Sequence, residues 1–155
     1  TPNVCRARSE GTVRLASADP AQPPRIDFRY FTDPDKYDER VMVEGVKTAR
    51  RIAAQPALAG WIVRELAPGP SVQSDAEISA YVRATANTVY HPAGTCKLGD
   101  PSDPLAVVDP QLRVRGVAGL RVADASVFPS MTTVNPAITV FMIGERCAAL
   151  VRGEA

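Results

Sequence analysis

Histidine is nearly absent from this sequence, which has a single one, His91, in 155 residues. The three cysteines, Cys5, Cys96 and Cys147, are odd in number and far apart. A disulfide framework needs an even set, and a zinc site needs close pairs or nearby histidines. We therefore expect reduced thiols, as in a cytoplasmic protein. Any chemistry in this chain that needs an imidazole must use His91.

Charge of one sign is not in excess either, because 18 basic residues balance 17 acidic ones and the net charge is +1. This balance gives no electrostatic reason to expect nucleic acid or an anionic membrane as a partner. The longest apolar stretch, residues 136–144, is too short to span a bilayer, and no signal peptide is recognisable. Without an initiator methionine, and with a polar stretch leading straight into a predicted strand, the chain is expected to be a fragment or a processed product.

Alternating apolar and polar side chains predict two strands, over residues 11–17 and 26–30, separated by a proline-rich connection. We expect them to pair antiparallel. Helical spacing of apolar residues and helix-breaking prolines predict three helices after them, over about residues 35–55, 57–66 and 75–86. Ser74 and Glu77 form a capping box at the start of the third helix, in which each side chain binds a free backbone amide.

The second half of the chain is expected to hold two more strands and a long helix. The strands are predicted over residues 112–115 and 119–125 from the same alternation. The helix is predicted over residues 136–152, with Asn135 suited to cap it, Pro136 to occupy its first position and the following glycine to end it. Four apolar residues of this helix are expected in the core rather than at a cofactor: Ile138, Phe141, Met142 and Ala149.

His91 lies on an irregular segment whose neighbours restrict its backbone. Pro92 forces the residue before it into extended backbone, and Gly94 permits a tight turn just after it. A base on a stiff, non-helical segment suits proton transfer, which needs fixed geometry. The residues alone leave two interpretations open, a structural histidine and a general base.

The start of the last helix is the second informative feature. Its first residues offer free backbone amides and the positive end of the helix dipole, which stabilise a developing anion. Asn135 therefore has two interpretations, a helix cap or part of a ligand site.

Short motifs that run in order through nearly the whole chain carry a family resemblance. The motifs are GTVRL (11–15), SADP (17–20), YHPAGTC (90–96), LG (98–99), VVD (107–109), LRV (112–114), GLRVADAS (119–126), VNP (134–136) and MIGER (142–146). Together they resemble the glucose-methanol-choline (GMC) oxidoreductase family. The resemblance is strongest to its choline oxidase and choline dehydrogenase branch, because Asn135 stands where other members have a second histidine.

The resemblance implies FAD as the cofactor and a small-molecule alcohol as the substrate. His91 would take the hydroxyl proton while a hydride passes from the alcohol carbon to the flavin. Asn135 would hydrogen-bond the alcohol or alkoxide oxygen, and the helix from Pro136 would point its amides at the flavin carbonyl edge. The electron acceptor would be dioxygen or a quinone.

The resemblance also implies contacts between this chain and FAD. Asp124 and Ala125 would lie against the phosphate and ribityl region, and a turn at the end of a strand is the alternative interpretation of Asp124. The further implied contacts are Tyr90, Asn135, Pro136 and Thr139.

The sequence departs from the family's pattern in three places. The glycine-rich dinucleotide-binding turn is absent, and residues 116–119 lack its spacing. We therefore expect an N-terminal FAD-binding portion outside this chain, and little flavin binding by the chain alone. Leu98 replaces a methionine of similar volume. Asn135 replaces the second histidine and, as an amide, cannot act as a base.

The expected fold is α+β. It comprises a mostly antiparallel sheet with helices, from a substrate-binding domain, and the C-terminal strand and helix of an FAD-binding Rossmann-like domain. A change in sequence character near Gly99 divides residues 1–99, part of the substrate-binding domain, from residues 100–155, which return to the FAD-binding domain. We expect exposed apolar surface around Val122 and Ile138, where the rest of the protein belongs.

Three alternatives to an alcohol oxidoreductase stay open. A hydroxynitrile lyase-like relative would keep FAD without net electron transfer, and a non-catalytic fragment or interaction subunit would not need His91. A metal site at Asp100, Asp103 and Asp109 is least favoured, because their spacing fits no calcium loop.

Overall fold

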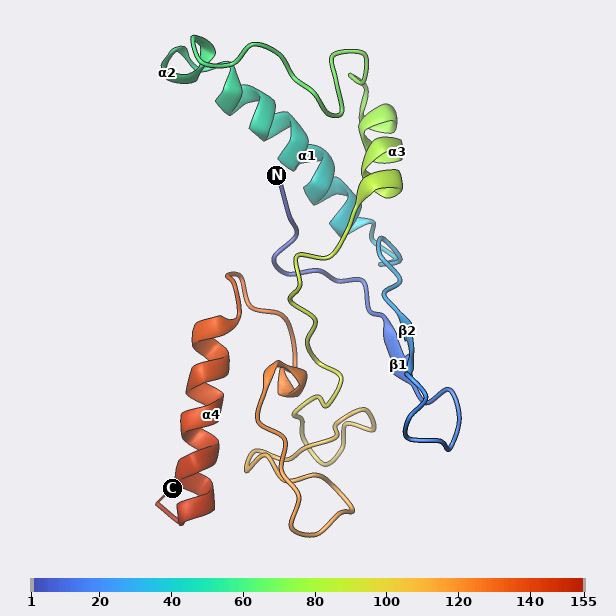
Figure 1. Ribbon diagram of the computed structural model, residues 1–155, viewed down its shortest axis with the longest axis vertical. Coiled ribbons are helices and arrows are strands. Elements are labelled where there is room, and N and C mark those ends of the chain that lie inside the picture. The colour runs from blue at the N-terminus through green and yellow to red at the C-terminus, as the bar shows by residue number, and fades with distance from the viewer. Residues whose placement is uncertain (1, 155) are drawn as a thin grey trace. The chain divides into compact units, whose positions relative to one another are not determined.

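The computed structural model of the chain describes residues 2–154, which form two compact units that divide between Val89 and Tyr90 (Figure 1). We call them the N-terminal unit and the C-terminal unit. The predicted change of character at Gly99 lies within the C-terminal unit, because the backbone just before Gly99 hydrogen-bonds to later residues of that unit. The assignment of residues 1–99 and 100–155 to two domains of a larger protein stays a prediction.

The predicted strand pair of the N-terminal unit is present but short. β1 (Thr12–Arg14) pairs antiparallel with β2 (Arg25–Asp27), with Val13 opposite Ile26. The alternation beyond β2 does not continue as a strand, because Arg29 has a left-handed backbone conformation with a φ of 50°.

The first predicted helix is confirmed by α1 (Tyr37–Ala53), which ends before Pro56. At its start the Asp33 carboxylate accepts a hydrogen bond from the Tyr37 amide, which satisfies one free N–H group of the first turn. Acidic residues in the first turn and basic residues in the last turn complement the helix dipole: Asp38, Glu39, Arg50 and Arg51.

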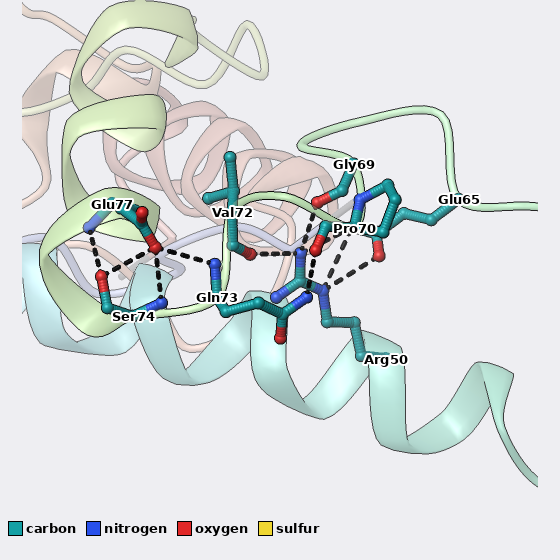
Figure 2. Close-up of polar contacts among 8 residues, drawn as sticks. All are labelled: Arg50, Glu65, Gly69, Pro70, Val72, Gln73, Ser74 and Glu77. Carbon is teal, nitrogen blue, oxygen red and sulfur yellow. Dashed lines mark hydrogen bonds and ion pairs between the residues drawn. The ribbon is translucent and has the colours of Figure 1, made fainter.

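The third predicted helix is confirmed by α3 (Asp75–Thr85), which starts with the expected capping box. The Ser74 hydroxyl accepts a hydrogen bond from the Glu77 amide, and the Glu77 carboxylate accepts one from the Ser74 amide (Figure 2). α3 packs against α1, and the two helices lie side by side in Figure 1. The buried core of the N-terminal unit comes from these two helices: Val43, Val46, Ile78 and Val82.

The second predicted helix, over residues 57–66, is wrong beyond its first turn. α2 (Pro56–Ala59) is one turn long, and the chain continues from it as a loop to the start of α3. A longer helix would have nothing to pack against, since Trp61, Val63 and Leu66 are 87%, 97% and 78% exposed. Helices of this length depend on such packing for their stability.

Arg50 of α1 holds this loop in place (Figure 2). Its Nε and Nη2 atoms donate to the Glu65 carboxylate over 2.9–3.1 Å. Nη2 also donates to the backbone carbonyls of Gly69 and Val72, at 3.1 and 2.8 Å. One guanidinium group thus satisfies a carboxylate and two carbonyls of a segment that forms neither helix nor strand.

The C-terminal unit contains a 3₁₀ turn, η1 (Ala125–Val127), and a long helix, α4 (Ala137–Arg152). Gly153, with a φ of 75°, ends α4 as predicted. The core of this unit consists of four buried residues, against which one side of α4 packs: Val108, Leu112, Val127 and Phe128.

The two strands predicted over residues 112–115 and 119–125 are wrong. The segments face each other through one antiparallel bridge, between Arg113 and Arg121, but form no ladder. Positive φ angles at Leu112 and at the glycines of the connecting turn interrupt the extended backbone that a ladder requires.

Helices and a small antiparallel sheet agree with the expected α+β class. The Rossmann-like part of that expectation is not confirmed, because the sheet within residues 2–154 is two-stranded and antiparallel. Among the helices of residues 2–154, none has the length and apolar character that crossing a bilayer requires.

Replacement of Arg50 tests whether it anchors the loop. Arg50→Ala is expected to lower the free energy of unfolding by about 2 kcal/mol, because it leaves a half-buried carboxylate and two carbonyls without their donor. The same variant should be cleaved faster by proteases within residues 60–72. Urea denaturation and limited proteolysis measure the two effects.

The neighbouring Arg51 is the matched control for this change. It is exposed and donates only to the Thr48 hydroxyl on its own helix. Arg51→Ala is therefore expected to change the free energy of unfolding by less than about 0.5 kcal/mol. Equal losses in the two variants would contradict the anchoring role of Arg50.

Candidate functional site

The segment that carries His91 is held by the backbone of η1. The amides of Gly94, Cys96 and Leu98 donate to carbonyls of consecutive residues of η1, with N–O distances of 3.2, 2.8 and 2.9 Å; the acceptors are Ala125, Ser126 and Val127. His91 itself is half-buried and lies in no helix or strand. Its backbone is therefore positioned by this ladder, three residues away, rather than by a regular element.

Left-handed backbone flanks His91 on both sides. Gly94 has a φ of 82°, as the predicted tight turn requires, and a Cβ atom there would lie 3.4 Å from the Phe128 carbonyl oxygen. Tyr90 has a φ of 65°, which is unfavourable for a bulky side chain. Such a conformation persists only where the surrounding structure determines it, so the backbone just before His91 is set by tertiary contacts.

The expected cap on α4 is wrong. α4 begins at Ala137, and Pro136 takes the cap position in a helical conformation with a φ of −76°. Pro136 is buried and its carbonyl accepts the Val140 amide, so the first intrahelical bond starts one residue later than predicted. Asn135 lies outside the helix, is exposed, and makes no hydrogen bond within the part of the chain that the structure describes.

The positive end of α4 is uncompensated among the described residues. Its first turn holds no acidic residue, and no side chain caps it. The other long helices differ, since α1 and α3 both have acidic residues in the first turn and α3 also has a capping box. The free amides at the start of α4 are therefore suited to an electron-rich or anionic group.

α4 has apolar residues on two sides, and only one side packs on the core, where its residues are half-buried. The expected core residues Ile138, Phe141 and Met142 are 82%, 73% and 62% exposed, so that expectation is wrong within this chain. The opposite side packs on the core instead, through Val140, Ile143, Cys147 and Leu150. The predicted exposed apolar surface is confirmed at Ile138, whereas Val122 is half-buried against the core.

The Asp124 carboxylate takes part in a turn. Its Oδ1 atom accepts a hydrogen bond from the Ser126 amide at 2.8 Å, which starts η1. This is the alternative interpretation of Asp124, and the Asp-Ala-Ser sequence was its signal, because an aspartate often accepts the amide two residues on. Contact of Asp124 or Ala125 with FAD stays a prediction, as it does for Tyr90, which is 81% exposed, and half-buried Thr139.

All the predicted site residues belong to the C-terminal unit, and the ladder brings Ala125 against the His91 segment. The cavity of about 220 Å³ in this unit lies elsewhere. It is lined by the turn that joins the two bridged segments: Asp109, Arg113, Val114, Arg115, Val117, Ala118, Gly119, Leu120 and Arg121. None of these is a predicted catalytic or flavin-contacting residue, and Asp109 belongs to the least favoured metal site.

The three aspartates of the least favoured metal site are each engaged with protein groups. Asp100 accepts the amide and hydroxyl of Ser102. Asp103 pairs with Lys97 at 2.8 Å. Asp109 pairs with Arg113 at 2.8 Å. Each carboxylate therefore stabilises the loop in which it lies.

The chain belongs to a known enzyme family, as a family model described as GMC oxidoreductase matches residues 7–144. This chain is a GMC oxidoreductase family member. It is 60% identical over 152 residues to choline oxidase of Arthrobacter globiformis, a match that covers 98% of the chain and 28% of that protein. It is 49% identical over 150 residues to mitochondrial choline dehydrogenase of Homo sapiens, covering 96% of the chain and 25% of that protein.

Solved structures of the same family resemble the chain in fold. The pyridoxine 4-oxidase of Mesorbium loti matches with a TM-score of 0.87 and 32% identity, covering 97% of the chain and 29% of that protein. An FAD-dependent oxidoreductase from Chaetomium thermophilum matches with a TM-score of 0.84 and 34% identity, covering 93% and 24%. The chain thus spans under a third of the length of each of these proteins.

Acid should remove a stabilising contribution of Asp109. Burial raises the pKa of this carboxyl, but hydrogen bonds from the Arg113 amide and guanidinium and from the Gln111 amide outweigh it and hold the pKa below its usual value. A lowered pKa in the folded state stabilises the fold above the pKa of the unfolded chain, about 3.9, and that contribution is lost as the pH falls below it.

Asp109→Asn is therefore expected to be less stable than the unchanged protein at neutral pH, with the difference shrinking below about pH 4. Urea denaturation between pH 7 and pH 2.5 measures the difference. Gln111→Ala removes no titrating group and is the control, since its effect should not vary over this range. A difference for Asp109→Asn that stays constant down to the lowest pH would contradict the assignment.

Proposed function

We propose that this chain is the C-terminal part of an FAD-dependent oxidoreductase that oxidises the CH–OH group of an alcohol, with choline as the first substrate to test. The observation that carries the proposal is the family match over residues 7–144, together with 60% identity to a choline oxidase. The backbone ladder that holds His91 supports it further, because a general base needs fixed geometry.

The start of α4 fits the electron-rich edge of a flavin. Free amides, an uncompensated dipole and a neighbouring exposed apolar surface at Ile138 are the features that support this fit. Asn135, Pro136 and Thr139 would hold the cofactor here, and the segments at Tyr90 and at Asp124 with Ala125 would hold it elsewhere. FAD, when bound, supplies the two-electron acceptor for the hydride of the alcohol carbon.

His91 and Asn135 have different chemical roles in this proposal. The His91 imidazole takes the hydroxyl proton of the alcohol and so favours the alkoxide. The Asn135 carboxamide donates a hydrogen bond to the same oxygen and stabilises its developing charge. As an amide it cannot take up the proton itself. Asn135 is free for this because Pro136, not Asn135, starts the helix.

The rest of the enzyme is part of the proposal. An N-terminal portion would supply the glycine-rich turn that binds the FAD pyrophosphate, which this chain lacks. Dioxygen or a quinone would accept the electrons, and the reduced cysteines suit a cytoplasmic protein.

His91→Ala in the full-length protein tests the base. We expect kcat/KM for choline to fall by about 10²–10⁴, the usual contribution of general base catalysis, with the flavin content unchanged. Turnover is measured with an artificial electron acceptor. Gln22→Ala, on the exposed connection between β1 and β2, is the control and should keep normal turnover. Normal turnover in His91→Ala would rule out the base.

Asn135→Ala separates a ligand contact from a helix cap. Because Asn135 caps nothing in the structure, its loss should leave the melting temperature unchanged, whereas loss of a true cap costs about 1 kcal/mol. We expect kcat for choline to fall by about 10²-fold, as when one donor to a developing oxyanion is removed. Steady-state kinetics and thermal melting decide; a lower melting temperature with normal kcat would contradict the assignment.

A further inference from the structure

The turn η1 is stabilised differently at its two ends. At its C-terminal end, Val127 and Phe128 are 2% and 4% exposed and are packed in the core of the C-terminal unit. At its N-terminal end, Asp124 is exposed and Ala125 is only half-buried. The C-terminal end is therefore buried in the core, whereas at the N-terminal end Ala125 only packs on its edge, and a further interaction adds to that packing.

Hydrogen bonds of Asp124 provide that interaction. The Asp124 carboxylate accepts the Ser126 amide at 2.8 Å, and the Asp124 carbonyl accepts the Val127 amide at 3.2 Å. The amides of the turn are thereby satisfied from within it. The Ser126 and Val127 carbonyls accept amides of the His91 segment, and the Ala125 carbonyl is shared between the Gly94 amide and the Phe128 amide, each at 3.2 Å.

The end of the turn that depends on Asp124 is also the end nearest to His91. The Ala125 carbonyl accepts the Gly94 amide at 3.2 Å, whereas the packed end, at Val127, accepts Leu98 at 2.9 Å. Gly94 is the first residue of the ladder, three positions after His91. If the Ala125 carbonyl moved, the Gly94 amide would lose its acceptor, and the backbone that leads to His91 would become more mobile.

We propose that Asp124 is a positioning residue for His91, which acts by holding the Ala125 carbonyl in place for the Gly94 amide. This rests on the function proposed above, in which His91 is the base. Asp124 then acts through the backbone, and what it needs is an acceptor oxygen at its side chain rather than a negative charge. Asn provides the same acceptor, and Ala does not.

The test compares Asp124→Ala, Asp124→Asn and Asp100→Ala in the full-length protein. Asp100 is the matched control, since its Oδ1 atom accepts the amide of Ser102, again two residues on, at 2.9 Å in an exposed loop. Hydrogen–deuterium exchange, with fragmentation that resolves single residues, follows the amides of Gly94 and Leu98. Steady-state kinetics with choline and the flavin content are measured on the same samples.

In Asp124→Ala we expect the Gly94 amide to exchange about tenfold faster, with a smaller change at Leu98, because one hydrogen bond of the turn is lost. We also expect kcat to fall by about tenfold or more with little change in KM, as for a misplaced catalytic group. Asp124→Asn should restore slow exchange at Gly94, because Asn keeps the acceptor oxygen, and Asp100→Ala should change neither the exchange nor kcat.

Two results would overturn the proposal. The first is unchanged exchange at Gly94 in Asp124→Ala, whatever the flavin content, because the carboxylate would then not hold the Ala125 carbonyl in place. The second is exchange at Gly94 that is as fast in Asp124→Asn as in Asp124→Ala. That result would make the negative charge of Asp124 the essential feature. Amide exchange at Gly94 is measured without substrate turnover. Normal turnover in His91→Ala would therefore refute the proposed base and would leave the exchange test of the turn valid.

Discussion

The C-terminal unit depends on the hydrogen bonds between residues 94–98 and the turn η1. No helix or strand contains His91, and the backbone that follows it is held by this ladder. The ladder in turn depends on a core in which Val127 and Phe128 are buried. Burial of apolar side chains thus fixes a short turn, and this turn positions the segment of the one histidine in these 155 residues.

Aspartate side chains accept hydrogen bonds from backbone amides that strand pairing would satisfy in other folds. Asp38 is 3% exposed and accepts the backbone amides of Arg8 and Ser9 at 2.9 and 2.8 Å. Asp109 and Asp124 do the same for turns of the C-terminal unit. A backbone with few ladders leaves many amides without partners, and short acidic side chains satisfy them locally.

α4 has more apolar surface than this chain buries. One side packs on the core, while Ile138 and Phe141 on the other are exposed to the extent of 82% and 73%. The GMC oxidoreductases that the chain matches are more than three times its length, which is consistent with a second set of contacts for this helix in a larger protein. The uncompensated N-terminus of the same helix lies beside exposed Ile138.

Local features of the sequence were enough to predict the long helices and the family. The capping box at Ser74, the proline that stops α1 and the glycine that ends α4 act within a few residues, so they can be predicted without knowledge of the fold. The short motifs that run in order through the chain indicated the family for the same reason, because the residues of each motif are adjacent, and the family match over residues 7–144 confirms it.

Tertiary structure alone decided which apolar residues are buried and what holds His91. Residues 112–115 alternate like a strand, yet Leu112 has a left-handed conformation and is buried in the core. Periodicity cannot reveal which face of α4 meets the core, nor that the Ala125 carbonyl accepts a hydrogen bond from the amide of Gly94, 31 positions earlier in the chain. Burial and long-range hydrogen bonds depend on what surrounds a residue in space, and sequence patterns record only what surrounds it along the chain.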